Sequence, residues 1–286
     1  MSLTDASFKI LEIKAKGLIS RAEVTAKIIK NTGKGIRFFV REDLGNFPES
    51  IETGLSLNDN EDAVIAHVSQ ISSTQRNTVL SNGKSSICLT EHFLAACALL
   101  NVKDIDVFLD QEELPFGDGS ANLWLSLFKD TPFSEPILSS DVNLKEEIII
   151  RDSQQPHKFI KAIPIDTNFN ATYQMNWAHP KIGEQSFTWT LANSLVEEIA
   201  NARTFSTEAE NQILGLSDWI VGITDTDFTM PLRFTDEPSR HKVLDLIGDL
   251  LLAGINPLRF KMQLISNQGG HHLNSLLAAK LSEQYA

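Results

Sequence analysis

One stretch of the sequence, residues 239–250, constrains the fold of this chain more than any other. It places His241, Asp245 and Asp249 at successive intervals of four residues, with leucines at several of the positions between and beside them. Because an α-helix has 3.6 residues per turn, side chains at this spacing lie one above the other on a single face. The pattern therefore predicts a helix over residues 240–252 that buries its leucines and holds three polar groups in a row.

The polar row has two interpretations. A histidine and a carboxylate one turn apart can bind one metal ion, and the third carboxylate then lies nearby, where it can orient a neighbouring group. A surface helix with a solvated polar face shows the same spacing. The spacing alone does not separate the two, so the choice depends on the rest of the chain.

Composition limits the class of protein. The chain has 286 residues, of which 42% are hydrophobic and 22% charged, as in a globular protein with a substantial core. Its formal net charge of −12 argues against general nucleic-acid binding, so we expect no nucleic-acid partner. An anionic substrate would have to be held by local basic groups.

The two cysteines, Cys88 and Cys97, do not form a Cys-x-x-Cys pair, which favours a reducing, cytoplasmic setting. The N-terminus lacks the apolar segment of a signal peptide, and no run approaches the ~20 apolar residues of a spanning helix. We therefore expect a cytoplasmic protein, whose contact with membranes is at most peripheral, and a monomer.

The order of predicted elements repeats once along the chain. Strand patterns, with period-two alternation or short apolar runs, precede two helices that enclose a further strand in each half. In the first half the helices are residues 90–100 and 121–128, and the strands are residues 8–13, 24–29, 36–40, 64–70, 78–80, 86–89 and 105–109. In the second half the strands are 148–150, 159–163, 171–177, 187–191 and 260–265, and the helices are 194–201, 240–252 and 273–284. We predict an α+β protein with two domains of similar β-α-α-β topology, residues 1–133 and 142–286.

Four polar stretches lie beside these elements. They are Glu91-His92, His241 with Asp245, the Gly-His turn at His271, and the Ala-Arg-Thr-Phe segment that contains Thr204. Each alone also fits a structural or solvated role, such as a glutamate at a helix start or a surface threonine. Together they supply two histidines and one aspartate for a zinc ion with one open position, the composition of a catalytic zinc site.

A zinc site of this kind fits amide hydrolysis. Zinc lowers the pKa of its bound water to about 7, a carboxylate base removes the proton, and a second acid serves the leaving amine. These parts are needed together because water is a poor nucleophile and an amine is a poor leaving group.

Six motifs, in order and over nearly the whole chain, resemble the UDP-3-O-acyl-N-acetylglucosamine deacetylase family, zinc enzymes of lipid A synthesis. They are Thr-Glu-His at 90–92, Asp-Gly-Ser-Ala at 118–121, His-Pro at 179–180, Ala-Arg-Thr-Phe at 202–205, Arg-His-Lys-x-Leu-Asp-x-Ile-Gly-Asp at 240–249 and Gly-His-x-Leu-Asn at 270–274. The resemblance implies a fold in which the helices of both domains are sandwiched between two sheets.

The resemblance also implies a role for each matching residue. It implies that Zn2+ is bound by His92, His241 and Asp245, with Glu91 as general base. It implies that His271 stabilises the transition state and protonates the leaving amine. Among the remaining matches, Asp249 would orient His271, and Thr204 would donate to the developing oxyanion. Lys242 and Phe205 would contact the UDP-sugar lipid precursor.

Two departures concern the substrate. The family motif Gly-x-Gly-Leu-His-Ser-Gly is replaced here by residues 15–21, in which Ile19 stands in place of the histidine. The segment between Phe205 and Arg240 is also shorter than in the family, where it forms the passage for the acyl chain. Three hypotheses follow: deacetylation of UDP-3-O-(3-hydroxyacyl)-N-acetylglucosamine with release of acetate, deacetylation of another N-acetylated sugar nucleotide by a diverged paralogue, or a non-catalytic regulator that binds zinc or a nucleotide. Glu91, His271 and Asp249 argue against the third, because a binding protein needs none of them.

Overall fold

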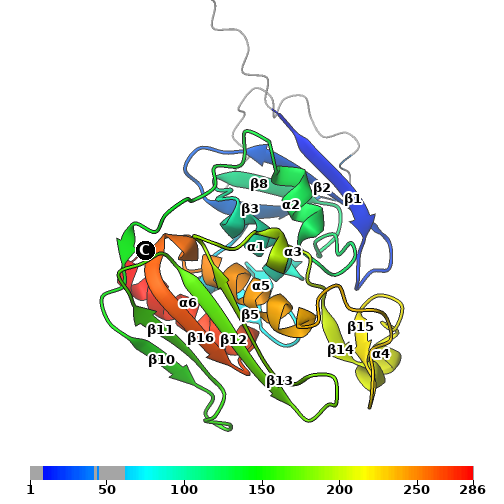
Figure 1. Ribbon diagram of the computed structural model, residues 1–286. Coiled ribbons are helices and arrows are strands. Elements are labelled where there is room, and N and C mark those ends of the chain that lie inside the picture. The colour runs from blue at the N-terminus through cyan, green and yellow to red at the C-terminus, as the bar shows by residue number, and fades with distance from the viewer. Residues whose placement is uncertain (1–8, 42–43, 45–61, 286) are drawn as a thin grey trace, which may run out of the picture.

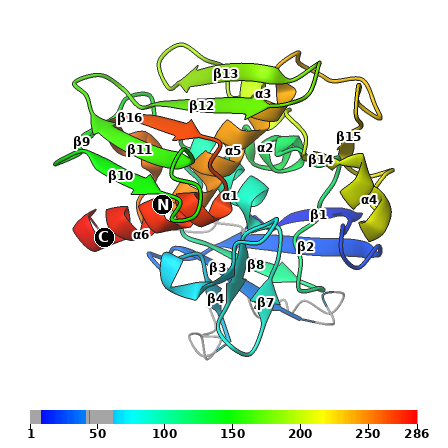
Figure 2. The same ribbon diagram turned by 90° about the horizontal axis from the view of Figure 1, so that it is seen from below.

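The computed structural model describes residues 9–41, 44 and 62–285. Two β-sheets face each other across a layer of helices (Figures 1 and 2). The first sheet has the order β1-β2-β8-β3-β4, with β1 Leu11–Lys16, β2 Glu23–Lys30, β3 Ile36–Val40, β4 Val64–Ile65 and β8 Ile105–Leu109. The second has the order β10-β11-β16-β12-β13, with β10 Ile148–Arg151, β11 Phe159–Pro164, β12 Asn170–Trp177, β13 Gly183–Thr190 and β16 Phe260–Asn267. A short strand, β9 (Val142–Asn143), also pairs with β16.

The two sheets have one topology. Each begins with an antiparallel hairpin, β1-β2 or β10-β11. The second strand of the hairpin, β2 or β11, pairs antiparallel with β8 or β16, the strand that follows the first long helix of that half. That strand, β8 or β16, pairs parallel with β3 or β12 on its other side. The repeated element order thus predicted correctly that the two halves share one topology, but it did not predict the order of the strands within each sheet.

Six α-helices accompany the sheets in the part of the chain that the structure describes. They are α1 Thr90–Leu99, α2 Asn122–Phe128, α3 Glu197–Ala200, α4 Glu208–Leu214, α5 Glu237–Leu251 and α6 His271–Tyr285. The predicted α+β class and the helix layer between two sheets are confirmed. The domain boundaries at residues 133 and 142 stay a prediction, because buried side chains of both halves belong to one continuous apolar cluster.

Helices α1 and α5 cross at the centre of this layer. Every residue of α1 is buried, which suits a helix that is apolar on nearly all sides. On α5, Gly248 faces α1 so closely that a Cβ at this position would overlap the carbonyl oxygen of Glu91 and lie 3.0 Å from the backbone nitrogen of Ala95. The absence of a side chain at Gly248 therefore lets the two helices approach and brings Glu91-His92 beside the polar face of α5.

Replacing Gly248 by alanine is expected to destabilise the protein. The obstacle to the new methyl group is backbone, which cannot rotate away, so the helices must separate at a cost of about 1–3 kcal/mol. Chemical denaturation measures the free energy of unfolding. Gly270→Ala is the matched control, because a Cβ at Gly270 meets open space. Equal stability of the two variants would contradict this account of the helix crossing.

Two small sheets lie outside the main layers. One contains β5 Ile71–Ser73, β6 Val79–Ser81 and β7 Ser86–Ile87, and the other pairs β14 Phe205–Thr207 with β15 Val221–Ile223. The latter forms, with α4, a separate projection at one end of the molecule (Figure 1). Among the residues that the structure describes, no helix combines the length and hydropathy that a bilayer crossing requires.

Candidate metal centre and active site

The three residues expected to bind zinc lie together between α1 and α5. His92 comes from α1, and His241 and Asp245 come from successive turns of α5; all three are buried. One carboxylate oxygen, Asp245 Oδ1, lies 3.5 Å from His92 Nε2 and 3.3 Å from His241 Nε2. Two imidazole nitrogens and one carboxylate oxygen thus point at the same small volume.

This arrangement fits a zinc ion. Ligands at about 2.0–2.1 Å in a tetrahedron are separated by about 3.3 Å, close to both distances from Asp245 Oδ1. The Oδ1 atom is buried and accepts no hydrogen bond within the described residues, which is costly unless a cation lies against it. Burial lowers the pKa of His241 to about 3, so the imidazole is neutral at pH 7, as a metal ligand must be.

Neighbouring groups orient the two ligands on α5. The Nδ1 atom of His241 lies 3.0 Å from the carbonyl oxygen of Ala202 and donates to it, so the Nε2 lone pair faces the site. The other oxygen of Asp245 accepts from Lys242 Nζ at 2.8 Å. Burial works against the charged form of Asp245, but this ammonium helps to hold the pKa of the carboxyl well below its ordinary value.

A carboxyl and an imidazole lie beside the three candidate ligands. Glu91 is buried, and burial raises the pKa of its carboxyl above the ordinary value. His271 is the first residue of α6, and its Nδ1 lies 2.8 Å from Asp249 Oδ2. Burial alone would lower the pKa of His271, but the carboxylates of Asp249, Asp245 and Glu91 together raise the pKa to about 9, which favours the imidazolium at pH 7. The site therefore combines a carboxylate suited to accept a proton with an imidazolium suited to donate one.

The remaining candidates flank His241. The Phe205 ring is 5.9 Å from the His241 ring, and Lys242 Nζ lies 5.4 Å from the Phe205 ring centre. The Thr204 hydroxyl donates to the carbonyl oxygen of Gly119 at 3.0 Å, so it would have to rotate before it could donate to an oxyanion. Lys242 is already paired with Asp245, and contact of this ammonium with a substrate stays a prediction.

The family model described as UDP-3-O-acyl N-acetylglycosamine deacetylase matches residues 9–283. This chain belongs to that family. The match runs through both sheets and includes every candidate residue of the site, so membership of the deacetylase family makes the protein a hydrolase of the deacetylase class.

Relatives of the family agree with this assignment. The chain is 30% identical to the UDP-3-O-acyl-N-acetylglucosamine deacetylase of a Nostoc species, over 93% of each chain. It is 29% identical to the enzyme of that name from Chlamydia abortus, over 93% of this chain and 99% of the relative. The counterpart from Campylobacter curvus is 34% identical over 74% of each chain.

A mostly apolar cavity of about 500 Å³ lies beside the candidate metal centre of this family member. Phe205 lines this cavity and also lies next to the His241 ring. Its apolar lining comes from four separate segments and includes Leu18, Ile19, Leu89, Trp177, Leu214, Leu216 and Ile220. Ile19, which stands where the family carries a histidine, has an exposed fraction of 58% and lies at the rim of this cavity. The buried carboxylate of Glu113 holds this loop by accepting from the backbone N–H groups of Ile19 and Ser20.

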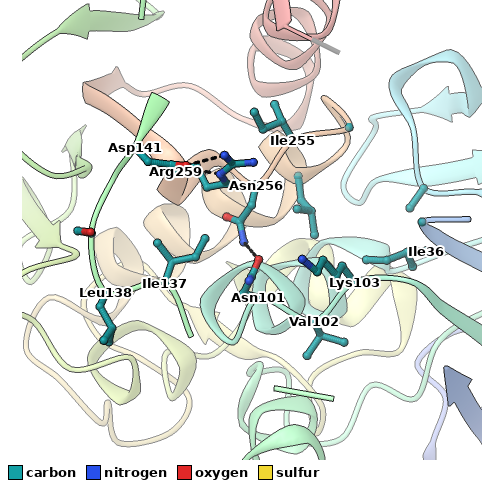
Figure 3. A pocket seen from close by; sticks show the side chains of 15 residues that line it. Ile36, Asn101, Val102, Lys103, Ile137, Leu138, Asp141, Ile255, Asn256 and Arg259 are labelled. Carbon is teal, nitrogen blue, oxygen red and sulfur yellow. Dashed lines mark hydrogen bonds and ion pairs between the residues drawn. The ribbon is translucent and has the colours of Figure 1, made fainter. Parts of the chain in front are cut away.

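A second cavity, of about 570 Å³, lies elsewhere, between the end of α5 and the segment that joins the two halves (Figure 3). Four polar side chains in its lining form two separate pairs. Arg259 pairs with Asp141 at 2.6 Å, and Asn256 donates to Asn101 at 3.3 Å. None of the candidate site residues lines this cavity, so its larger volume does not make it the active site of this deacetylase family member.

The Ala-Arg-Thr-Phe segment is fixed by one buried carboxylate at the start of α5. Glu237 accepts from the backbone N–H and the guanidinium of Arg203, at 2.8–3.1 Å, and from the backbone N–H of Arg233. Burial works against its charge, but these hydrogen bonds hold the pKa of Glu237 below its ordinary value. Glu237 thereby holds in place the segment that carries Thr204 and Phe205.

We expect the contribution of Glu237 to stability to depend on pH. Because its pKa is lower in the folded state, the contribution is present above the unfolded value, near 4.5, and is lost as the pH falls through the folded value. At pH 7, Glu237→Gln should lower the free energy of unfolding by about 2 kcal/mol, the range for hydrogen bonds to charged groups. Denaturant titrations at pH 7 and pH 3.5 test this. A loss that is as large at pH 3.5 as at pH 7 would refute the assignment.

Sequence reasoning missed two residues that contact the candidate catalytic groups. Asn274 donates to Asp249 Oδ2 at 2.8 Å, and its place in the Gly-His-x-Leu-Asn motif was a signal that could have found it. Thr78 donates from its backbone to Glu91 and from its hydroxyl to Asp249. Thr78 lies in a segment read only as a strand, and nothing local distinguishes it.

Proposed function

We propose that the protein hydrolyses the acetamide of UDP-3-O-(3-hydroxyacyl)-N-acetylglucosamine in a zinc-dependent reaction, releasing acetate and leaving a free amine, as a step of lipid A biosynthesis. The observation that carries the proposal is the convergence of the buried His92, His241 and Asp245 at one point, with Glu91 and His271 beside them. Membership of the deacetylase family supports the reaction class, and the names of the relatives support the substrate.

The residues divide the work of amide hydrolysis. Zinc bound by His92, His241 and Asp245 would polarise the acetamide carbonyl and lower the pKa of a bound water. Glu91 takes the proton from the attacking water, since its carboxylate is buried and adjacent in sequence to His92. His271 gives a proton to the departing nitrogen, and Asp249 keeps its imidazolium charged and oriented. Thr204 would donate to the oxyanion after leaving Gly119.

The cavity beside Phe205 is our candidate for the acyl chain. Its lining is mostly apolar and its volume, about 500 Å³, is large enough for an acyl chain. Each methylene buried in it contributes about 0.8 kcal/mol, so the acyl length that fills the cavity should bind tightest. The short segment between Phe205 and Arg240 favours a chain shorter than the one typical of the family.

Metal removal and substrate comparison test the proposal together. Purified protein is expected to hold about one zinc per chain, to lose activity on dialysis against a chelator, and to recover it on addition of Zn2+. Turnover should then be compared across precursors of different acyl length and against N-acetylated sugar nucleotides without an acyl chain. Preference for an unacylated substrate would favour the diverged paralogue. If zinc-loaded protein turned over none of these compounds, the proposed activity would be wrong.

A further inference from the structure

We propose that the hydroxyl of Thr78 is a positioning group for the deacetylation, an inference that rests on the function proposed above. Thr78 directly precedes β6 and is 1% exposed. It lies between α1, which carries the candidate base Glu91, and α5, which carries Asp249, the partner of the candidate acid His271. Its role would be to hold the Asp249 carboxylate, and through it His271, in a fixed position relative to Glu91.

Every polar group of Thr78 is used. Its backbone N–H donates to Glu91 Oε2 at 3.0 Å, and its hydroxyl donates to Asp249 Oδ1 at 2.6 Å. Its carbonyl oxygen accepts from the hydroxyl of Thr90, at 2.9 Å, and from the backbone N–H of the same residue, at 3.3 Å. One residue therefore connects the first turn of α1 with the last turns of α5, by hydrogen bonds and not by packing alone.

The Asp249 carboxylate shows why the hydroxyl matters. Its Oδ2 accepts from His271 Nδ1 and from Asn274 Nδ2, both at 2.8 Å, and its Oδ1 accepts from Thr78. Donors on both oxygens fix the plane of the carboxylate. Without the hydroxyl, one oxygen of a buried carboxylate loses its donor and the group is free to turn toward other partners. The His271 ring would turn with it.

Thr78 is set apart from its neighbours by what it contacts. Arg76 and Asn77 line the apolar cavity proposed for the acyl chain, whereas the hydroxyl of Thr78 is bonded to Asp249. Substitution at Thr78 should therefore change the chemical step and leave substrate binding nearly as it is.

Two substitutions separate the hydroxyl from the shape of the side chain. Thr78→Val keeps the volume and the backbone N–H to Glu91 but removes the donor to Asp249, and Thr78→Ser keeps the donor. With zinc-loaded protein, we expect Thr78→Val to lower kcat about 10–100-fold, as for other groups that orient residues at a metal site, with little change in KM or zinc content. Thr78→Ser should recover most of the loss.

A second readout needs no turnover. The proton between His271 Nδ1 and Asp249 should give a downfield NMR resonance, which Thr78→Val should shift or broaden and Thr78→Ser should restore. Ser140→Ala is the control for loss of a buried hydroxyl, because Ser140 donates to the carbonyl oxygen of Leu258 and contacts none of the site groups. It should lower stability and leave kcat unchanged.

The outcomes distinguish this inference from the proposed function. Wild-type protein that turns over the precursor, with Thr78→Val equal to it in kcat and in the resonance, would overturn the role of Thr78. An inactive wild-type protein whose resonance still responds to valine and serine as expected would overturn the proposed activity and support the positioning role. A fall in kcat that serine does not recover would show that shape, not the hydroxyl, is what matters, and would also overturn the inference.

Discussion

Replacing Glu91 by glutamine is expected to lower kcat by about 10²–10⁴-fold while zinc stays bound, because a glutamine cannot accept the proton of the attacking water. The change keeps the shape of the side chain, and the amide oxygen can still accept the backbone N–H of Thr78. The metal should be unaffected, since Glu91 is not one of the three residues whose ligand atoms converge.

Steady-state kinetics and metal analysis of the same preparation test the role of Glu91. Glu283→Gln, an exposed substitution near the C-terminus, controls for the loss of one negative charge. A Glu91→Gln protein with kcat within a few-fold of the wild type would remove Glu91 from the role of base. Loss of zinc from this variant would instead make Glu91 a metal ligand.

Replacing His241 by alanine is expected to remove zinc and, with it, all measurable activity. His241 is 2% exposed, and its Nε2 lies 3.3 Å from Asp245 Oδ1, so it would supply one of only three protein ligands. Substitutions of groups that merely support a metal ligand cost about 10–100-fold in affinity, and loss of a ligand should cost more.

Zinc per chain after dialysis is the direct measurement for His241→Ala, followed by an attempt to restore activity with added Zn2+. His157→Ala serves as control, since that histidine is exposed and should leave the metal content at about one per chain. Full retention of zinc by the His241 variant would refute its assignment as a ligand, and the metal centre would have to be sought elsewhere.

The sequence predicted the polar face of α5 correctly because the spacing of His241, Asp245 and Asp249 depends only on helix geometry. It misplaced the helix start: α5 begins at Glu237, and Pro238 occupies its first turn, where a proline is tolerated because that N–H has no partner within the helix. His271 was expected in a turn before the last helix and is instead the first residue of α6. Helix ends depend on local and tertiary contacts together, and the pattern of apolar residues does not contain them.

The polar stretches together predicted two histidines and one aspartate for a zinc ion, but only the resemblance selected His92 to join His241 and Asp245, because nothing in local periodicity brings α1 to α5. The roles of these residues remain predictions. Thr78 was beyond reach, since its two partners, Glu91 and Asp249, are 13 and 171 residues away in the sequence. The unit formed by β14, α4 and β15 was missed as well, because its elements are only three to seven residues long and carry little periodic signal.

The contact of Gly248 with the backbone of Glu91 bears on the order in which protein and metal come together. Backbone contact sets the separation of α1 and α5, so folding itself would bring the three candidate ligand atoms together, and no ion would be needed to gather them. Loading and unloading of the metal then become ligand exchange at an existing centre, and zinc would raise thermal stability only by mass action. In this respect the protein would differ from small zinc modules that unfold when their metal is withdrawn.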